Sequence, residues 1–250
     1  MIILVTGATS GFGLEISRSL VNDGHIVVGT GRRHERLAEI QAELGERFIA
    51  RALDVSSRDE VLAAVDAIER EVGAIDALIN NAGLALGLES AEQSSLDDWD
   101  EMINTNIRGL VYCTHAALPH MVKRQAGWII NLGSTAGTYP YPGGNVYGAT
   151  KAFVHQFSLN LRSDLAGKKV RVTSIEPGLC GGTEFSNVRF KGDDTAANNV
   201  YAGTDPLTAR DIADTVRWIL ALPEHVNINA IEMMPTCQAP GPMIVRRNNQ

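Results

Sequence analysis

The stretch Ile2-Ile-Leu-Val-Thr-Gly-Ala-Thr-Ser-Gly-Phe-Gly13 opens the chain and decides its fold. It begins with a continuous apolar run, which is typical of a strand buried on both faces of a parallel sheet. Three glycines follow in the spacing G-x-x-x-G-x-G, and a helical apolar pattern then continues to Asn22-Asp-Gly24. Glycine lets the backbone approach a ligand closely, and a helix N-terminus attracts an anion. Glycine clusters also serve ordinary turns, but this one directly follows a buried strand and therefore predicts a dinucleotide pyrophosphate site.

Strands and helices alternate from this stretch onward. Further strands are predicted at 26–30, 48–53, 75–79, 128–132, 170–175 and 228–232. Helices are predicted near 35–45, 96–124, 146–165 and 208–222, the last of them capped by Thr208-Ala-Arg-Asp211, and another after the capping box Ser57-Arg-Asp-Glu60. The sequence therefore predicts an α/β fold, in which residues 1–250 form a single Rossmann-type domain with a doubly wound parallel sheet of about seven strands. Residues 179–205 are expected to form a lid on the substrate side, and 235–250 a C-terminal tail.

Composition excludes several classes of function. The chain has 250 residues, 44% of them hydrophobic, which is enough for one extensive core. A formal net charge of −7 argues against binding to nucleic acid or to an anionic membrane surface. Cys113, Cys180 and Cys237 show no metal-ligand or redox spacing, so no metal is predicted and a reducing compartment is favoured. The N-terminus is too short and uncharged for a signal peptide, and no apolar run approaches ~18 residues. We expect a soluble cytoplasmic protein.

Two arginines end the second predicted strand. Arg32 and Arg33 lie about 20 residues after the glycine turn, where a site for NAD would place an acidic residue for the ribose hydroxyls. Their planar, permanently charged guanidinium groups match a 2′-phosphate instead. The alternative is a solvated basic turn. We expect NADP as the cofactor, with these arginines selecting it.

A hydroxyl, a phenol and an ammonium group are expected to lie together after the fifth strand. Ser134 follows that strand, and Tyr147 and Lys151 are four residues apart on the next helix, one turn from each other. A phenol useful near neutral pH must be stabilised as phenolate by about 4 kcal/mol. A positive charge at ~4 Å supplies that much only at an effective dielectric constant of about 20, so the pair needs a partly closed cleft. The alternative is a chance surface pair. The packed side of this helix is expected to hold Ala149, Ala152, Phe153, Phe157, Leu159 and Leu161.

Six candidate site residues follow the ends of separate predicted strands. In a doubly wound sheet the carboxyl ends of the strands share one edge, where ligands bind. We therefore expect these residues to meet there: Gly7, Arg32, Asp54, Asn81, Ser134 and Pro177.

At these positions the sequence resembles the short-chain dehydrogenase/reductase superfamily over essentially its whole length. The motifs that carry the resemblance are Thr6-Gly7-x-x-x-Gly11-x-Gly13, Asn80-Asn-Ala-Gly83, Ser134, Tyr147-x-x-x-Lys151 and Pro177-Gly178. The resemblance implies that Tyr147 is the acid/base, that Ser134 steadies the substrate oxygen, and that Lys151 holds the nicotinamide ribose and lowers the pKa of Tyr147. Asn106 matches the fourth catalytic position, which supports a water in a proton relay. Taken alone, an Asn within a helix is usually solvated or merely tolerated.

The resemblance also implies where the cofactor lies. Asp54 and Val55 would contact the adenine, Asn81 would lie along the cofactor, and 177–183 would surround the nicotinamide end. The expected cofactor-binding residues are Gly7, Thr9, Ser10, Gly11, Phe12, Gly13, Arg32, Arg33, Asp54, Val55, Asn81, Tyr147, Lys151, Pro177, Gly178, Leu179 and Thr183. A homotetramer is implied as well. The tail after Pro235 has little core left to join, so we expect it to pack on a neighbouring subunit.

A closer resemblance is to the bacterial NADP-dependent 3-hydroxy acid dehydrogenases, also called serine or allo-threonine dehydrogenases. It is carried by 143–147, 181–193 and 225–229. It implies hydride transfer between NADP and the C3 hydroxyl carbon of a small 3-hydroxy acid: serine, L-allo-threonine, 3-hydroxyisobutyrate, or 3-hydroxypropionate and malonic semialdehyde. Ser134 and Tyr147 would contact this substrate. Arg189, in the excursion, is the candidate for binding its carboxylate, unless it is a solvated lid residue.

Two other functions remain open. The chain could be a general NADPH-dependent carbonyl or quinone reductase on the same scaffold. It could also be an NADP-binding sensor without turnover, although such a protein would be free to lose the three catalytic residues that this sequence retains.

Overall fold

Seven parallel strands form the centre of the computed structural model, which describes residues 1–241. They are β1 (Ile2–Val5), β2 (Ile26–Gly31), β3 (Phe48–Ala52), β4 (Ala77–Asn80), β5 (Gly127–Leu132), β6 (Val170–Pro177) and β7 (Ala230–Met233). Their order in the sheet is β3-β2-β1-β4-β5-β6-β7, and each neighbouring pair is parallel. The chain crosses from one half of the sheet to the other between β3 and β4, so the sheet is doubly wound. The predicted fold class is confirmed.

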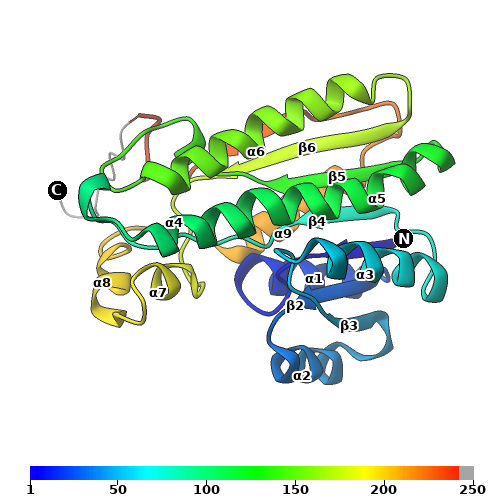
Figure 1. Ribbon diagram of the computed structural model, residues 1–250, viewed down its shortest axis with the longest axis horizontal. Helices are drawn as coiled ribbons and strands as arrows, with labels where there is room; N and C mark the ends of the chain where they lie inside the picture. The colour runs from blue at the N-terminus through cyan, green and yellow to red at the C-terminus, as the bar shows by residue number, and fades with distance from the viewer. Residues whose placement is uncertain (242–250) are drawn as a thin grey trace.

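Helices cover both faces of the sheet (Figure 1). They are α1 (Gly11–Asn22), α2 (His34–Leu44), α3 (Arg58–Glu71), α4 (Leu96–Ile103), α5 (Leu110–Arg124), α6 (Asn145–Asp164), α7 (Phe185–Arg189), α8 (Asp194–Asn199) and α9 (Ala209–Leu220). A π-helical turn, Asn104–Gly109, joins α4 to α5, and short 3-10 helices span Gly45–Arg47, Ala91–Gln93 and Thr135–Gly137.

Two hydrophobic cores lie on opposite faces of this sheet. Ile3 and Val5 pack into the core formed with α1, α2 and α9, whereas Leu4 packs into the core formed with α3, α5 and α6. Alternate residues of a strand point to opposite faces, so a strand covered on both sides must be apolar throughout. This explains the continuous apolar run at the start of the sequence.

The inward face of α6 is not the one that the apolar pattern predicts. Of the six residues expected to be packed, only Leu161 is fully buried; Ala149 and Ala152 are exposed. The buried residues are Tyr147, Thr150, Lys151, Val154, Ser158 and Leu161. The buried polar side chains have partners inside the protein: the Thr150 hydroxyl accepts a hydrogen bond from Asn106, and the Ser158 hydroxyl accepts one from Asn131.

The two predicted caps have different outcomes. Thr208 and Asp211 form both hydrogen bonds of a capping box at the start of α9. Ser57 precedes α3 as predicted, but its side chain makes no capping hydrogen bond. Glu60, the other half of the predicted box, accepts a hydrogen bond from the Asp54 amide at 3.4 Å instead. The helix start is therefore correct, and the predicted box is wrong.

The excursion and the tail lie at the ligand-binding edge. Helices α7 and α8 lie together at the end of the molecule that also holds α4 (Figure 1). In the tail, the Gln238 side chain accepts a hydrogen bond from the Leu179 amide at 2.7 Å. Residues 235–241 thus contact their own chain next to β6. Residues 242–250, including the apolar Met243-Ile-Val245, lie outside the described residues.

Two features are absent from the described part of the chain. No helix within residues 1–241 is long and apolar enough to cross a membrane. The same residues contain no group of three or more His, Cys, Asp or Glu side chains arranged to hold a metal ion.

Candidate active site

The turn after β1 has a conformation and a packing that require glycine. Gly7 and Gly11 have φ angles of +67° and +51°, in the left-handed region that side chains disfavour. A Cβ atom added at Gly13 would lie 2.2 Å from the Gly7 carbonyl oxygen, and one at Gly7 would lie 2.9 Å from the Cα of Ala82. The Asn81 side chain donates a hydrogen bond to the Gly7 carbonyl at 3.0 Å, which ties the turn to the end of β4. Gly7 and Gly13 therefore permit close packing of the turn against itself and against the end of β4, while Gly7 and Gly11 also line a cavity.

A cavity of about 380 Å³, here called the glycine-loop cavity, runs from this turn to Tyr147. The predicted cofactor-binding residues that line it are Gly7, Thr9, Ser10, Gly11, Phe12, Arg32, Arg33, Asp54, Val55, Asn81, Tyr147, Lys151 and Thr183. Gly13 does not line it and packs beneath the turn. The glycine turn, the two arginines after β2 and the buried ammonium of Lys151, all in the lining of one cavity, fit a dinucleotide.

A second cavity of about 350 Å³, here called the lid cavity, continues from the first. Predicted residues that line it are Ser134, Tyr147, Pro177, Gly178, Leu179, Thr183 and Arg189. The two cavities share Phe12, Gly133, Tyr147, Thr183 and Phe185. Tyr147 therefore stands where they meet. A reaction between a dinucleotide in one cavity and a small molecule in the other would take place beside its ring.

Ser134, Tyr147 and Lys151 come together as predicted. Tyr147 and Lys151 are each only 8% exposed, and the Lys151 ammonium lies 5.8 Å from the centre of the Tyr147 ring. The Lys151 ammonium donates a hydrogen bond to the Leu132 carbonyl at 2.8 Å, which fixes its direction. The Ser134 hydroxyl accepts from the Ala136 amide at 3.1 Å and donates to the Pro177 carbonyl at 3.4 Å. These contacts exclude a chance surface pair, because both members are buried.

The pKa of Tyr147 moves in the direction opposite to expectation. Burial raises the pKa of Tyr147 above its ordinary value, while a hydrogen bond with Ser134 and the positive charge of Arg189 partly oppose this rise. Burial also lowers the pKa of Lys151 to about 8. The rise comes chiefly from burial of the phenol, and the Lys151 ammonium is directed at a backbone carbonyl. That Lys151 lowers the pKa of Tyr147 stays a prediction for the enzyme with its cofactor bound.

Asn106 is buried within the π-helical turn between α4 and α5. It is 2% exposed, so the solvated alternative is excluded. Its side chain accepts from the Leu84 amide at 2.9 Å and donates to the Leu84 carbonyl at 2.8 Å and to the Thr150 hydroxyl at 3.0 Å. Asn106 lines neither cavity. It joins the backbone after β4 to the residue that precedes Lys151 on α6.

Arg189 is the last residue of α7, within the excursion 179–205, and it lines the second cavity. Its Nε donates to the Gly87 carbonyl at 3.1 Å and its Nη2 to the Tyr141 hydroxyl at 2.7 Å. The guanidinium carbon lies 5.6 Å from the centre of the Tyr147 ring. No group within residues 1–241 hydrogen-bonds to Nη1. The side chain is therefore anchored, not a free solvated arginine, and retains donor capacity toward the lid cavity.

The two arginines after β2 are also held in place. The Nε and Nη2 atoms of Arg33 both donate to the Thr9 hydroxyl, at 3.2 and 3.1 Å, and its Nη1 lies 3.1 Å from a carboxylate oxygen of Glu184. Arg32 lies 3.8 Å from Glu101. Both arginines line the glycine-loop cavity, beside the turn and not away from it.

A profile of the short chain dehydrogenase family matches residues 1–194. The chain belongs to the short-chain dehydrogenase family. It is 58% identical over 251 residues to the NADP-dependent 3-hydroxy acid dehydrogenase YdfG of Salmonella typhi, with 99% of this chain and 100% of that protein covered. It is 53% identical over 237 residues to serine 3-dehydrogenase of Agrobacterium fabrum, with 95% and 94% covered. The structure of the closed form of a serine dehydrogenase complexed with NADP+ superposes with a TM-score of 0.94 at 58% identity, covering 96% of each chain.

These similarities confirm the predicted family and the prediction of an enzyme, an oxidoreductase. Among the residues that line the cavities of this short-chain dehydrogenase but are absent from the predicted site residues are Tyr141, Glu184 and Phe185. Glu184 and Phe185 directly follow Thr183 and lie in 181–193, a stretch that carries the closer resemblance, so the sequence held a signal for them. Tyr141 lies in a loop without periodicity, and its contact with Arg189 joins positions 48 residues apart.

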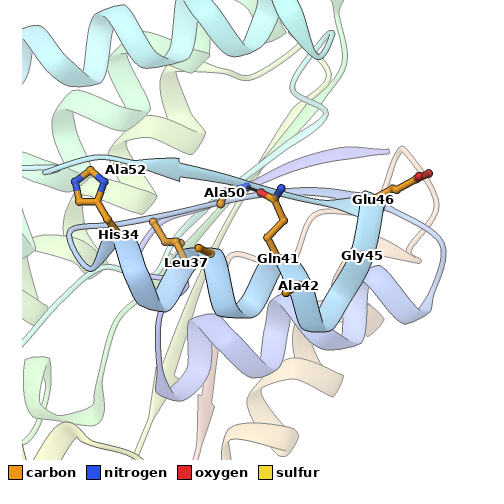
Figure 2. Close-up of a pocket in the computed structure, with 9 residues that line it drawn as sticks. His34, Leu37, Gln41, Ala42, Gly45, Glu46, Ala50 and Ala52 are labelled. Atoms are coloured by element: carbon orange, nitrogen blue, oxygen red, sulfur yellow. Dashed lines mark hydrogen bonds between the residues drawn. The ribbon is translucent and has the colours of Figure 1, made fainter.

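A further hollow, of about 590 Å³, lies between α2 and the edge strand β3 of the dehydrogenase (Figure 2). Its lining includes only His34 and Glu46 as ionisable side chains. Gln41 crosses the hollow and accepts a hydrogen bond from the Ala50 amide at 2.9 Å (Figure 2). This bond pairs one amide on the open edge of β3. None of the predicted site residues lines this hollow. The hollow is larger in volume than either cavity at Tyr147, but its two ionisable side chains do not form the kind of acid/base cluster that an active site needs.

Proposed function

We propose that this dehydrogenase catalyses the reversible oxidation of small 3-hydroxy acids at C3, with NADP as cofactor. The observation that carries the proposal is the position of Tyr147 where the glycine-loop and lid cavities meet, with Lys151 lining the first and Arg189 the second. The names of the two relatives support it, since one is an NADP-dependent 3-hydroxy acid dehydrogenase and the other a serine 3-dehydrogenase.

The residues divide the chemistry between them. NADP, when bound, supplies the hydride acceptor or donor. Tyr147 as phenolate takes the proton from the substrate hydroxyl, or as phenol returns it to a carbonyl oxygen, because it is the titratable group at the junction; the positive charge of an oxidised nicotinamide nearby would favour the phenolate that burial disfavours. Ser134 donates a hydrogen bond to that oxygen and stabilises the charge that develops on it. Lys151 contributes a buried positive charge and a donor toward the nicotinamide ribose, and Asn106 supports the segment from which a water-mediated proton path would leave.

Arg189 is the proposed ligand of the substrate carboxylate. A guanidinium group recognises a carboxylate by charge and by paired hydrogen bonds. Two of its nitrogens are held by Gly87 and Tyr141, so little side-chain freedom is lost when the third binds substrate. The proposed substrates are serine, L-allo-threonine, 3-hydroxyisobutyrate and 3-hydroxypropionate, with malonic semialdehyde in the reducing direction. Oxidation of serine or allo-threonine gives a β-carbonyl acid, whose loss of CO₂ needs no further protein group.

One observation favours a second candidate, a general NADPH-dependent carbonyl or quinone reductase. Away from Arg189 the lid cavity is lined by apolar and aromatic side chains, which would accept an uncharged ketone: Leu88, Tyr139, Phe190, Val200 and Tyr201. A screen of NADP reduction across small hydroxy acids, with NAD as the cofactor control and uncharged ketones tested with NADPH, separates the two. Higher kcat/KM on the hydroxy acids is expected; higher kcat/KM on the ketones would replace the first function by the second.

We also propose a cytoplasmic homotetramer. The described structure contains the three cysteines as free thiols, in keeping with a reducing compartment. On α6 the rings of Phe153 and Phe157 stack with their centres 5.6 Å apart; both residues are half-buried, Phe157 against the core of its own chain, and the part of the pair that stays uncovered is the surface we assign to contact with another subunit. Gel filtration with light scattering tests the assembly, and a monomer at working concentration would contradict it.

A further inference from the structure

The guanidinium group proposed to bind the 2′-phosphate already holds an anion from its own chain. Arg33 donates to the Thr9 hydroxyl through Nε and Nη2, and its Nη1 pairs with the Glu184 carboxylate at 3.1 Å. A carboxylate and a phosphate offer the same kind of oxygen acceptors to a guanidinium fork. Glu184 therefore stands where a 2′-phosphate oxygen would be expected to pair with Nη1.

Glu184 belongs to the part of the lid that lies directly over the glycine-loop cavity. Its neighbour Thr183 has its Cβ 3.4 Å from the position that a Cβ on Gly11 would take. Its other neighbour, Phe185, has its ring 5.8 Å from the ring of Tyr147. The ion pair with Arg33 thus joins the nucleotide side of the cavity to the segment that reaches the catalytic tyrosine.

We propose that Glu184 competes with the 2′-phosphate of the cofactor for Arg33, and so weakens the binding of NADP without affecting NAD. This inference rests on the proposed function, in which NADP is the cofactor and Arg33 contacts its 2′-phosphate. Glu184 is a specificity-determining residue in this account, because the phosphate is the group that distinguishes the two nucleotides.

The charges give the sign and the size of the effect. The Arg33 and Glu184 side chains are 48% and 55% exposed, so their ion pair is weak and a doubly charged phosphate can displace the carboxylate. The displaced carboxylate stays near the phosphate, since residues 183 and 185 are packed, and like charges repel. Removing the charge of Glu184 should therefore tighten NADP binding about 2- to 5-fold, and added salt should reduce the difference.

A second lid ion pair provides the matched control. Asp98 on α4 pairs with Lys191 of the lid at 2.8 Å, and neither residue lines either cavity. Asp98→Asn breaks one ion pair of the lid, as Glu184→Gln does, but leaves Arg33 paired. It therefore separates competition for Arg33 from a general loosening of the lid.

The test is isothermal titration of NADP+ and of NAD+ into wild type, Glu184→Gln, Asp98→Asn and Arg33→Ala at low ionic strength. Glu184→Gln should bind NADP+ about 2- to 5-fold more tightly with NAD+ unchanged, and Asp98→Asn should bind both as wild type does. Unchanged or weaker NADP+ binding by Glu184→Gln, equal tightening for both nucleotides, or the same tightening in Asp98→Asn would overturn the proposal. If the proposed function itself is wrong, the titrations give a different result: wild type binds NAD+ more tightly than NADP+, and Arg33→Ala does not weaken NADP+ binding.

Discussion

Replacing Tyr147 by Phe removes a single oxygen atom from the point where the glycine-loop and lid cavities meet. The ring is retained, together with its packing against Phe185 at 5.8 Å, so the fold should lose only the hydrogen bond with Ser134, about 1 kcal/mol. The reaction should lose its acid/base, which contributes about 10²- to 10⁴-fold to a rate. This corresponds to about 3–5 kcal/mol of transition-state stabilisation. The variant should therefore be folded and nearly inactive.

Two measurements on each variant test this expectation. We expect kcat for serine oxidation to fall by at least about 100-fold, while the Kd for NADPH, measured by titration, stays close to that of wild type. Tyr141→Phe is the matched control, because it removes a phenol oxygen from the lid cavity, one that accepts a hydrogen bond from Arg189 and belongs to a residue that does not line the glycine-loop cavity. That control should change KM for serine more than kcat. A Tyr147→Phe enzyme that retains kcat within about tenfold of wild type would refute the assignment of the acid/base.

Three further outcomes are expected. Arg189→Ala should raise KM for serine and 3-hydroxypropionate about 10- to 100-fold, because a charge-assisted hydrogen bond to the substrate carboxylate is lost. KM for uncharged ketones should stay unchanged, and an equal rise in KM for the acids and the ketones would show that Arg189 is not the carboxylate ligand. Burial lowers the pKa of Lys151 to about 8 from 10.5, so the folded state binds fewer protons than the unfolded state at a pH between these two values. The contribution of Lys151 to the free energy of unfolding therefore increases as the pH rises through this range. In urea titrations the free energy of unfolding of wild type relative to Lys151→Met should rise by about 3 kcal/mol from pH ~8 to pH ~10.5, and a constant difference would contradict the pKa. Asn106→Ala should destabilise the protein by about 2–4 kcal/mol, because buried groups lose their partners, whereas Asn160→Ala on the exposed side of α6 should cost less than about 0.5 kcal/mol.

The fold could be predicted because its signals are local. The apolar run of β1 and the glycines after it are adjacent in sequence, and the left-handed φ of Gly7 and Gly11 depends on the turn itself. The positions after each strand could also be predicted, since the carboxyl ends of parallel strands share an edge whatever the details of packing. This is why most of the predicted cofactor-binding residues line one continuous pair of cavities.

The inward face of α6 could not be predicted in the same way. A helix normally buries its apolar stripe, but here the buried stripe contains Tyr147, Thr150, Lys151 and Ser158. Burial of these groups is tolerated because distant parts of the chain supply hydrogen bonds, such as the one from Asn106 to Thr150 across 44 positions. Apolar periodicity carries no information about partners so far away.

The direction in which the pKa of Tyr147 shifts could not be predicted from the sequence, for a related reason. Spacing places Lys151 one turn from the phenol, but it does not fix where the ammonium points. That direction is set by the Leu132 carbonyl on β5, and the balance of burial against charge depends on side chains from distant parts of the chain, such as Arg189 of α7. Glu184 illustrates the same limit, because its pairing with Arg33 requires the lid to lie across the glycine turn.

The walls of the two cavities come from different parts of the chain. Most of the lid cavity is built from 133–147 and 177–241, whereas the nucleotide-facing wall of the glycine-loop cavity is built mainly from 7–12, 31–33, 53–55 and 81–84. In a protein built this way, the C-terminal segments that line the lid cavity can change during evolution while the N-terminal segments that line the glycine-loop cavity stay the same. Grafting 189–241 from a distant homologue onto this scaffold leaves every residue that lines the glycine-loop cavity in place, Glu184 included, and should therefore alter which alcohol is oxidised without altering which nucleotide is used.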